Sequence, residues 1–186
     1  MCKLTNPDYV INLKNINAPC EILNFCNYHR IKDYAYDFIL LTTTGHWITM
    51  KIGRSVSGNQ FGERIYRQAG HLPGFGANTL TGPSGSDMLL VVDAVKQAYP
   101  FAEFDLIKDN ILIRLWDVTN EHNPTMDDDA YCTRMIENTL VDEYEAIHGC
   151  LPVGNFKDTR NEKSSPFVSS DTFHSLFEEK LLTFDD

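Results

Sequence analysis

Two strand-forming runs separated by a short turn constrain the fold of this chain more than any other feature. The runs are YDFILLTT, residues 36–43, and HWITMKIG, residues 46–53, and both are rich in aromatic and β-branched residues. Thr44 and Gly45 lie between them. A connection this short favours an antiparallel hairpin, so the sequence predicts a β-sheet that includes both runs.

The length of the turn decides which side chains share a face of this hairpin. A two-residue turn at Thr44 and Gly45 places Lys51 opposite Phe38, and Tyr36 then lies on the same face as Lys51, diagonal to it. A three-residue loop would reverse this parity and move Tyr36 to the other face.

Further strands and helices are expected on both sides of the hairpin. Residues 9–16 and 110–118 have strand-like composition, and helical spacing is found in 20–31, 58–70, 87–99 and 130–149. We expect the last helix to bury a stripe formed by Ile136, Leu140, Tyr144 and Ile147. Glu137 would then lie at the edge of that stripe, held against the core and within reach of a cleft.

Length and composition indicate one globular domain with added segments. The chain has 186 residues, a net charge of −10 and five cysteines, an odd number with no CxxC pair. No apolar run approaches the ~18 residues that a membrane span needs, and the first ten residues contain no apolar signal segment. We therefore expect a cytoplasmic protein with free thiols and no membrane association.

One cluster of cations stands out against this acidic background. Lys51, Arg54, Arg64 and Arg67 lie within a stretch that contains one carboxylate, Glu63. A protein that repels polyanions as a whole can therefore still hold a phosphate locally.

Three short motifs in one order resemble the GIY-YIG nuclease family. KIG at 51–53 resembles the second half of the signature, in the variant where Lys replaces Tyr. FGERIYRQ at 61–68 resembles the family's arginine helix, and IENTLVDEYEAIHGCLPVGN at 136–155 resembles its glutamate helix with the Pro-and-Asn segment. The resemblance covers residues 34–155.

This resemblance implies a fold and an activity. The expected fold is α/β, more closely α+β: a small three-stranded antiparallel sheet flanked by helices. An N-terminal arm, 1–33, and a C-terminal extension, 156–186, would be added to the domain at 34–155. The implied activity is a DNA endonuclease that uses Mg²⁺ or Mn²⁺. The chain's size and additions favour a site-specific restriction enzyme, which as a homodimer would cut both strands.

The same resemblance suggests roles for individual residues. Arg64 takes the position of the catalytic arginine, Glu137 that of the metal-binding acid, and Asn155 that of the closing asparagine, which is expected to bind DNA. Lys51 would join Arg64 in stabilising charge on the phosphate. The two remaining cations of the cluster, Arg54 and Arg67, are expected to contact the DNA backbone.

The general base is the point at which the sequence departs from the family. The first tyrosine of the signature should lie about eleven residues before KIG, where this chain has Leu40 and Leu41. Parity makes Tyr36 the expected base in its place. His71 either takes the role of a histidine that some members carry after the arginine, or simply caps the helix.

Two alternatives to a restriction enzyme remain open. One is a homing or phage-type nuclease that acts on branched or single-stranded DNA. The other is a catalytically inactive GIY-YIG-like module that binds protein or nucleic acid, and both the net charge of −10 and the displaced tyrosine favour it.

Overall fold

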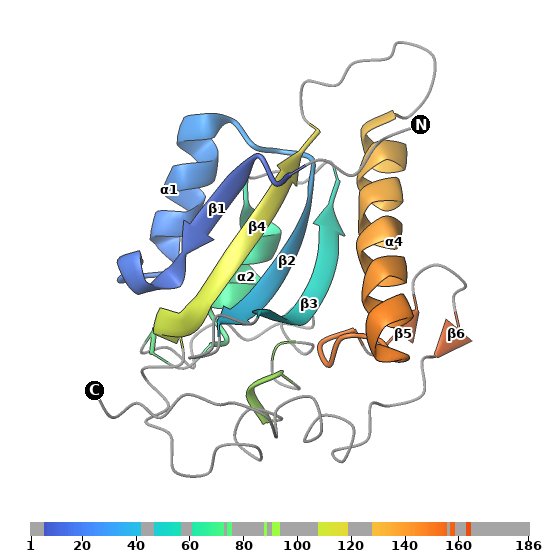
Figure 1. Cartoon of the computed structure of the whole chain (residues 1–186). Coiled ribbons are helices and arrows are strands. Elements are labelled where there is room, and N and C mark those ends of the chain that lie inside the picture. Colours follow the sequence, from blue (N-terminus) through green and yellow to red (C-terminus); the bar gives the residue numbers. More distant parts are fainter. Residues whose placement is uncertain are drawn as a thin grey trace.

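An antiparallel sheet in the order β1-β4-β2-β3 is the centre of the computed structural model (Figure 1). Its strands are β1 (Tyr9–Asn12), β2 (Tyr34–Leu41), β3 (Trp47–Ser55) and β4 (Ile111–Asp117). A separate pair is formed by β5 (Lys157–Asp158) and β6 (Lys163–Ser164). The structure describes residues 6–41, 47–56, 61–72, 74–75, 88, 91–93, 108–118, 128–155, 157–158 and 163–164.

The expectation of a three-stranded sheet is wrong by one strand. The added strand is β1, which pairs with β4 so that Ile11 faces Ile113. The run at 9–16 is strand only as far as Asn12, because the 3-10 helix η1 (Leu13–Asn15) follows and the Asn12 side chain accepts a hydrogen bond from the Lys14 amide at 2.9 Å. Part of the expected N-terminal arm is therefore built into the sheet.

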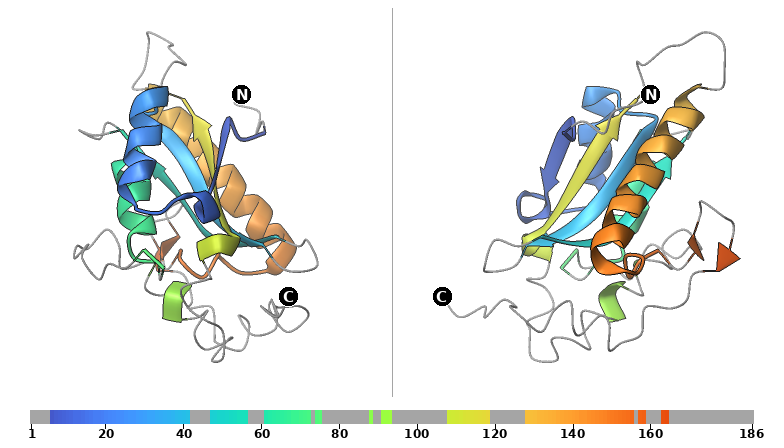
Figure 2. Two further views of the ribbon diagram at one scale, coloured as in Figure 1. Left: turned by 90° about the vertical axis from the view of Figure 1, so that its left-hand side faces the viewer. Right: turned by 45° about the vertical axis from the view of Figure 1, so that its right-hand side comes forward.

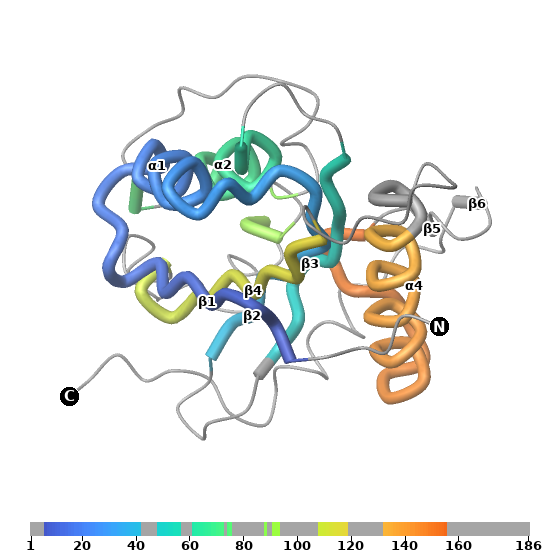
Figure 3. The backbone as a smooth tube through the Cα atoms, turned by 90° about the horizontal axis from the view of Figure 1, so that it is seen from above, coloured from blue at the N-terminus to red at the C-terminus, as the bar shows by residue number. Residues whose placement is uncertain are grey.

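Helices cover both faces of the sheet. The described helices are α1 (Cys20–His29), α2 (Glu63–Ala69) and α4 (Asp128–His148). Helices α1 and α2 lie side by side on one face and α4 lies on the other (Figures 2 and 3). Met88 and residues 91–93 are also helical, inside the helix expected at 87–99.

Each face of the sheet buries its own apolar cluster. On the α1/α2 face, Tyr34, Tyr36 and Phe38 are fully buried with residues of both helices. On the α4 face, the cluster contains Ala35, Ile52, Trp116, Leu140, Val141, Tyr144 and Leu151. This alternation along β2 follows from the two-residue period of a strand and explains why the whole of YDFIL is buried.

The register of β2 and β3 agrees with the prediction where the site lies, but for a different reason. Phe38 pairs with Lys51, as expected for a two-residue turn. Nearer the turn, however, Ile39 pairs with Thr49, and the register shifts between Phe38 and Ile39. Met50 is therefore the extra residue of a β-bulge, and the bulge restores the expected parity. Thr44 and Gly45 lie outside the described residues.

The buried side of α4 differs from the expected stripe. Leu140 and Tyr144 are buried as expected, but Ile147 is 77% exposed. Thr133 and Glu137 are buried instead, at 0% and 5% exposure, and they continue the same side of the helix toward its N-terminus. Glu137 therefore lies within the buried stripe rather than at its edge.

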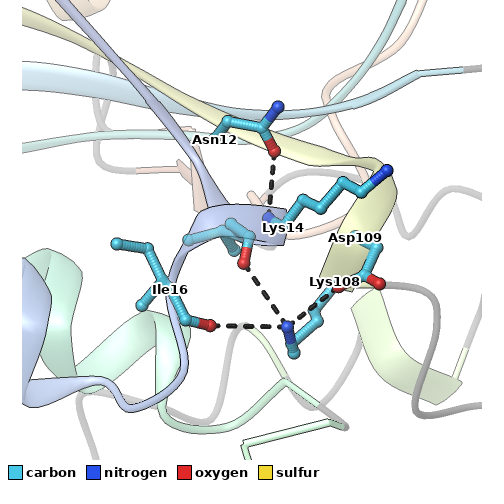
Figure 4. A network of polar contacts seen from close by, with 6 residues as sticks. Asn12, Lys14, Ile16, Lys108 and Asp109 are labelled. Carbon is cyan, nitrogen blue, oxygen red and sulfur yellow. Dashed lines mark hydrogen bonds and ion pairs between the residues drawn. The ribbon is translucent and has the colours of Figure 1, made fainter.

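A lysine connects the N-terminal segment to the start of β4. The Lys108 ammonium donates to the carbonyl oxygens of Leu13 and Ile16, each at 3.4 Å, and pairs with Asp109 at 2.8 Å (Figure 4). It also lies 5.5 Å from the centre of the Phe75 ring. These contacts hold η1, which follows β1, against the segment that leads into β4.

The cysteine prediction is confirmed for the four described cysteines, since Cys20, Cys26, Cys132 and Cys150 are free thiols.

Among the described helices, none combines the length and the apolar character needed to cross a membrane.

Candidate active site

A buried carboxylate lies against the outer strand of the sheet. Glu137 projects from α4, and its Oε2 lies 2.9 Å from Nε of Arg54 on β3. Arg54 pairs with Ala35 across the hairpin, and Ala35 belongs to the apolar cluster on the α4 face. Strand alternation therefore directs Arg54 toward α4, where it meets Glu137.

Three cations act on this carboxylate. Burial raises the pKa of Glu137, and the positive charges of Arg54, Lys51 and Arg64 oppose that rise, with Arg54 the strongest of the three. Lys51 pairs with Phe38 and so belongs to the opposite face of the sheet from Arg54. Side chains from both faces can meet around one group only at an edge of the sheet, and β3 is an edge strand. Lys51 and Arg64, which the sequence motifs group with Glu137, thus lie within electrostatic reach of its carboxylate.

Lys51 is held by the segment that follows α4. It is only 5% exposed, and its Nζ donates to the Gly154 carbonyl oxygen at 2.8 Å. The Gly154 amide in turn donates to the Met50 carbonyl at 2.9 Å. A buried lysine normally needs such a partner, so the position of its ammonium depends on the segment around Gly154.

Asn155 fastens the same segment to β3. Its Nδ2 donates to the Ile52 carbonyl and its Oδ1 accepts from the Ile52 amide, both at 2.8 Å. The side chain therefore pairs with the outer edge of β3 as a neighbouring strand would. Asn155 is 8% exposed, and this geometry makes it a positioning residue for Lys51.

Gly154 is absent from the residues that the sequence motifs single out, yet the site needs a glycine there. A Cβ at this position would lie 2.9 Å from Cγ2 of Val91 and 3.0 Å from both Cβ of Lys51 and the Met50 carbonyl oxygen. The glycine is visible in the sequence VGN. Its importance follows only from the close packing of this segment against β3.

Tyr36 lies across β3 at the glycine of KIG. It pairs directly with Gly53, and a Cβ on Gly53 would lie 2.6 Å from both Cζ and the hydroxyl oxygen of Tyr36. The end of the phenol ring therefore lies over Gly53, two residues from Lys51 on the same face. Tyr36 is fully buried, between the rings of Tyr34 at 6.0 Å and Phe38 at 5.9 Å.

Two other predicted residues lie on or just after α2. Arg67 is exposed and forms an ion pair with Glu63 one turn earlier. His71 follows the helix, two residues after its last residue, Ala69. Burial lowers the pKa of His71, which favours the neutral imidazole.

The donor set at Glu137 fits a hard divalent cation held mainly by water and phosphate. Among the described residues no group of three or more His, Cys, Asp or Glu side chains converges on one point. Magnesium is commonly held by one or two carboxylates, with water and substrate phosphate completing its shell. A buried carboxylate with cations acting on it is compatible with that mode.

Comparison of the chain with known protein families, with curated proteins and with solved structures finds no match.

Proposed function

We propose that this protein is a metal-dependent DNA endonuclease of the GIY-YIG type. The observation that carries the proposal is the buried Glu137 carboxylate at the edge of β3, with the charges of Lys51, Arg54 and Arg64 acting on it. These residues come from three separate segments, β3, α2 and α4, in the order that the family resemblance requires.

The chemistry of the site suits attack on a phosphodiester. Lys51 and Arg64 would bind the phosphate oxygens, whose negative charge increases in the transition state. Glu137 would hold a Mg²⁺ or Mn²⁺ ion, which when bound supplies Lewis-acid stabilisation of the leaving oxygen. Asn155 and Gly154 would keep Lys51 in position throughout.

Tyr36 is the proposed general base. Its hydroxyl lies over Gly53 on the Lys51 face, so a phosphate bound by Lys51 would be close to it. As the base, its phenolate oxygen would accept a proton from the attacking water.

A second candidate is the GIY-YIG-like binding module without catalytic activity. It is favoured by the complete burial of Tyr36, because a base must contact the attacking water. The nuclease would cut DNA at the edge of β3, whereas the module would bind protein or nucleic acid without cutting it.

A cleavage assay separates these candidates. Supercoiled plasmid, branched junctions and single-stranded oligonucleotides would be incubated with Mg²⁺, Mn²⁺ or EDTA. Discrete plasmid fragments that disappear in EDTA support a restriction-type enzyme, and cleavage confined to branched or single-stranded DNA supports a structure-specific nuclease. DNA binding without cleavage under either cation contradicts the nuclease and supports the binding module.

A further inference from the structure

We infer that Arg54 is a built-in counter-cation that a divalent metal must displace from Glu137, and that the displaced guanidinium then binds a DNA phosphate. This inference rests on the proposed function and concerns its regulation. It assigns to Arg54 a role different from that of a simple backbone contact.

Arg54 and Glu137 form a direct ion pair. Nε of Arg54 lies 2.9 Å from Oε2 of Glu137, while the Glu137 side chain is only 7% exposed. A buried carboxylate cannot rely on water to balance its charge, so the neighbouring guanidinium does so. Arg54 therefore already balances the charge of the carboxylate that would hold a metal ion.

The ion pair between Arg54 and Glu137 is released only if the arginine side chain moves. An arginine guanidinium does not lose its proton in proteins, so Arg54 keeps a positive charge that repels an incoming metal ion until the guanidinium moves away. The Arg54 side chain is 28% exposed, compared with 7% for Glu137, so it has a route toward solvent. Lys51, by contrast, is buried and donates to the Gly154 carbonyl.

Release of Arg54 would couple metal binding to DNA binding. Once Glu137 holds a divalent cation, its carboxylate no longer serves as a counter-charge for Arg54 at the edge of β3. A DNA phosphate offers the guanidinium a strong alternative partner. Metal binding should therefore strengthen DNA binding through Arg54, and by reciprocity DNA should strengthen metal binding.

The test measures Mn²⁺ binding in the absence of DNA, by the electron paramagnetic resonance signal of the free ion. Arg54→Gln is expected to bind Mn²⁺ at least about tenfold more tightly than the wild type, because a positive charge next to the ion has been removed. Arg67→Gln, which removes an exposed arginine of α2, should match the wild type. Adding Glu137→Gln to Arg54→Gln should abolish the gain. Unchanged or weaker Mn²⁺ binding by Arg54→Gln would overturn the inference.

A second measurement needs no substitution at Arg54 and so remains informative if that variant does not fold. The Nε–H resonance of Arg54 would be followed by nitrogen-15 NMR in wild-type protein titrated with Mg²⁺. We expect this resonance to shift while that of Arg67 does not, and the shift to be absent in Glu137→Gln. An Arg54 resonance that does not move up to about 20 mM Mg²⁺, well above the affinities of typical sites for this ion, would refute the exchange.

Failure of this inference and failure of the nuclease proposal are distinguishable. Exchange at Glu137 in a protein that cuts no DNA contradicts the nuclease alone. Metal-dependent cleavage by a protein whose Mn²⁺ affinity is insensitive to Arg54→Gln contradicts the exchange alone.

Discussion

At the scale of single residues, contacts between β2 and β3 explain why KIG ends in glycine. The hydroxyl end of Tyr36 occupies the space where a Cβ of Gly53 would lie. The strand therefore accepts a large aromatic residue at 36 only if its partner at 53 has no side chain. This pairing places the phenol on the same face of the sheet as Lys51, two residues along β3.

Gly53→Ala should destabilise the protein by about 1–3 kcal/mol, the usual cost of forcing an extra methyl group into a packed core. The new Cβ would lie 2.6 Å from the Tyr36 ring, closer than carbon atoms tolerate. Urea denaturation gives the free energy of unfolding. In a Tyr36→Leu background the same substitution should cost clearly less, and an equal cost in both backgrounds would show that the contact is not the cause.

Tyr36→Phe tests the proposed base. Loss of the hydroxyl should lower the single-turnover cleavage rate by roughly a hundredfold or more, the scale of one general base, while the ring still packs. The melting temperature should change little.

Tyr34→Phe is the matched control for that substitution. Tyr34 is equally buried, burial raises its pKa, and its hydroxyl lies near Ser55 and the backbone of Ile65. The substitution should affect stability more than cleavage. Full cleavage activity in Tyr36→Phe would exclude Tyr36 as the base, and loss in Tyr34→Phe instead would transfer the role to that residue.

Some of the site residues, but not all of their contacts, are predictable from the sequence. The order of the motifs along the chain is enough to group Lys51, Arg64 and Glu137. It does not reveal the partner of Arg54, although strand alternation already places positions 51 and 54 on opposite faces. What the sequence could not supply is the position of α4, which brings Glu137 to Arg54.

At the scale of elements, the segment after α4 acts as a short partner for the edge of β3. The Asn155 side chain makes both hydrogen bonds to Ile52, and Gly154 continues the contact to Met50 and Lys51. An exposed edge strand is thereby covered at the point where the site lies.

Asn155→Ala should lower the free energy of unfolding by about 1–3 kcal/mol, because it leaves a buried amide and a buried carbonyl of Ile52 without these partners. Cleavage should fall further than stability alone predicts, since Lys51 loses its support. Chemical denaturation and single-turnover rates at a temperature well below the melt would separate the two effects. Asn27→Ala, at an exposed asparagine of α1, is the control. Wild-type stability in Asn155→Ala would mean that the segment is held by other contacts.

Elements are predicted more reliably than their details. Strand composition and helical spacing locate β2, β3, β4, α1, α2 and α4. The bulge at Met50 could not be predicted from the sequence. A two-residue turn without a bulge and a longer turn with a bulge give the same strand register at Lys51. The buried side of α4 is displaced for a related reason: an acid and a threonine occupy positions where the pattern demands apolar residues.

At the scale of the whole molecule, the buried acid of the site reduces stability at neutral pH. Burial raises the pKa of Glu137 above its ordinary value of 4.5, so the folded protein binds this proton more tightly than the unfolded chain does. The group therefore contributes its stability below pH 4.5, and that contribution is lost as the pH rises through the folded-state pKa.

Glu137→Gln should consequently be more stable than the wild type at pH 7.5, since it replaces a buried charge with a neutral group of the same shape. The difference should shrink toward acidic pH, where the wild-type carboxyl is protonated in both states. Urea denaturation at neutral and at acidic pH measures the difference in the free energy of unfolding between the two proteins at each pH. A gap that is constant with pH, or that widens in acid, would contradict the stated direction of the pKa shift.

The central claim is that Glu137 carries metal-dependent cleavage of DNA at the edge of β3. The most direct test is the single-turnover cleavage rate with Mg²⁺ at saturating protein, for the wild type, Glu137→Gln and Glu143→Gln. Glu143 is an exposed glutamate on the same helix and serves as the matched control. We predict that Glu137→Gln binds DNA but has no metal-dependent cleavage, whereas Glu143→Gln cleaves at the wild-type rate. Cleavage by Glu137→Gln at a rate close to that of the wild type would contradict the claim.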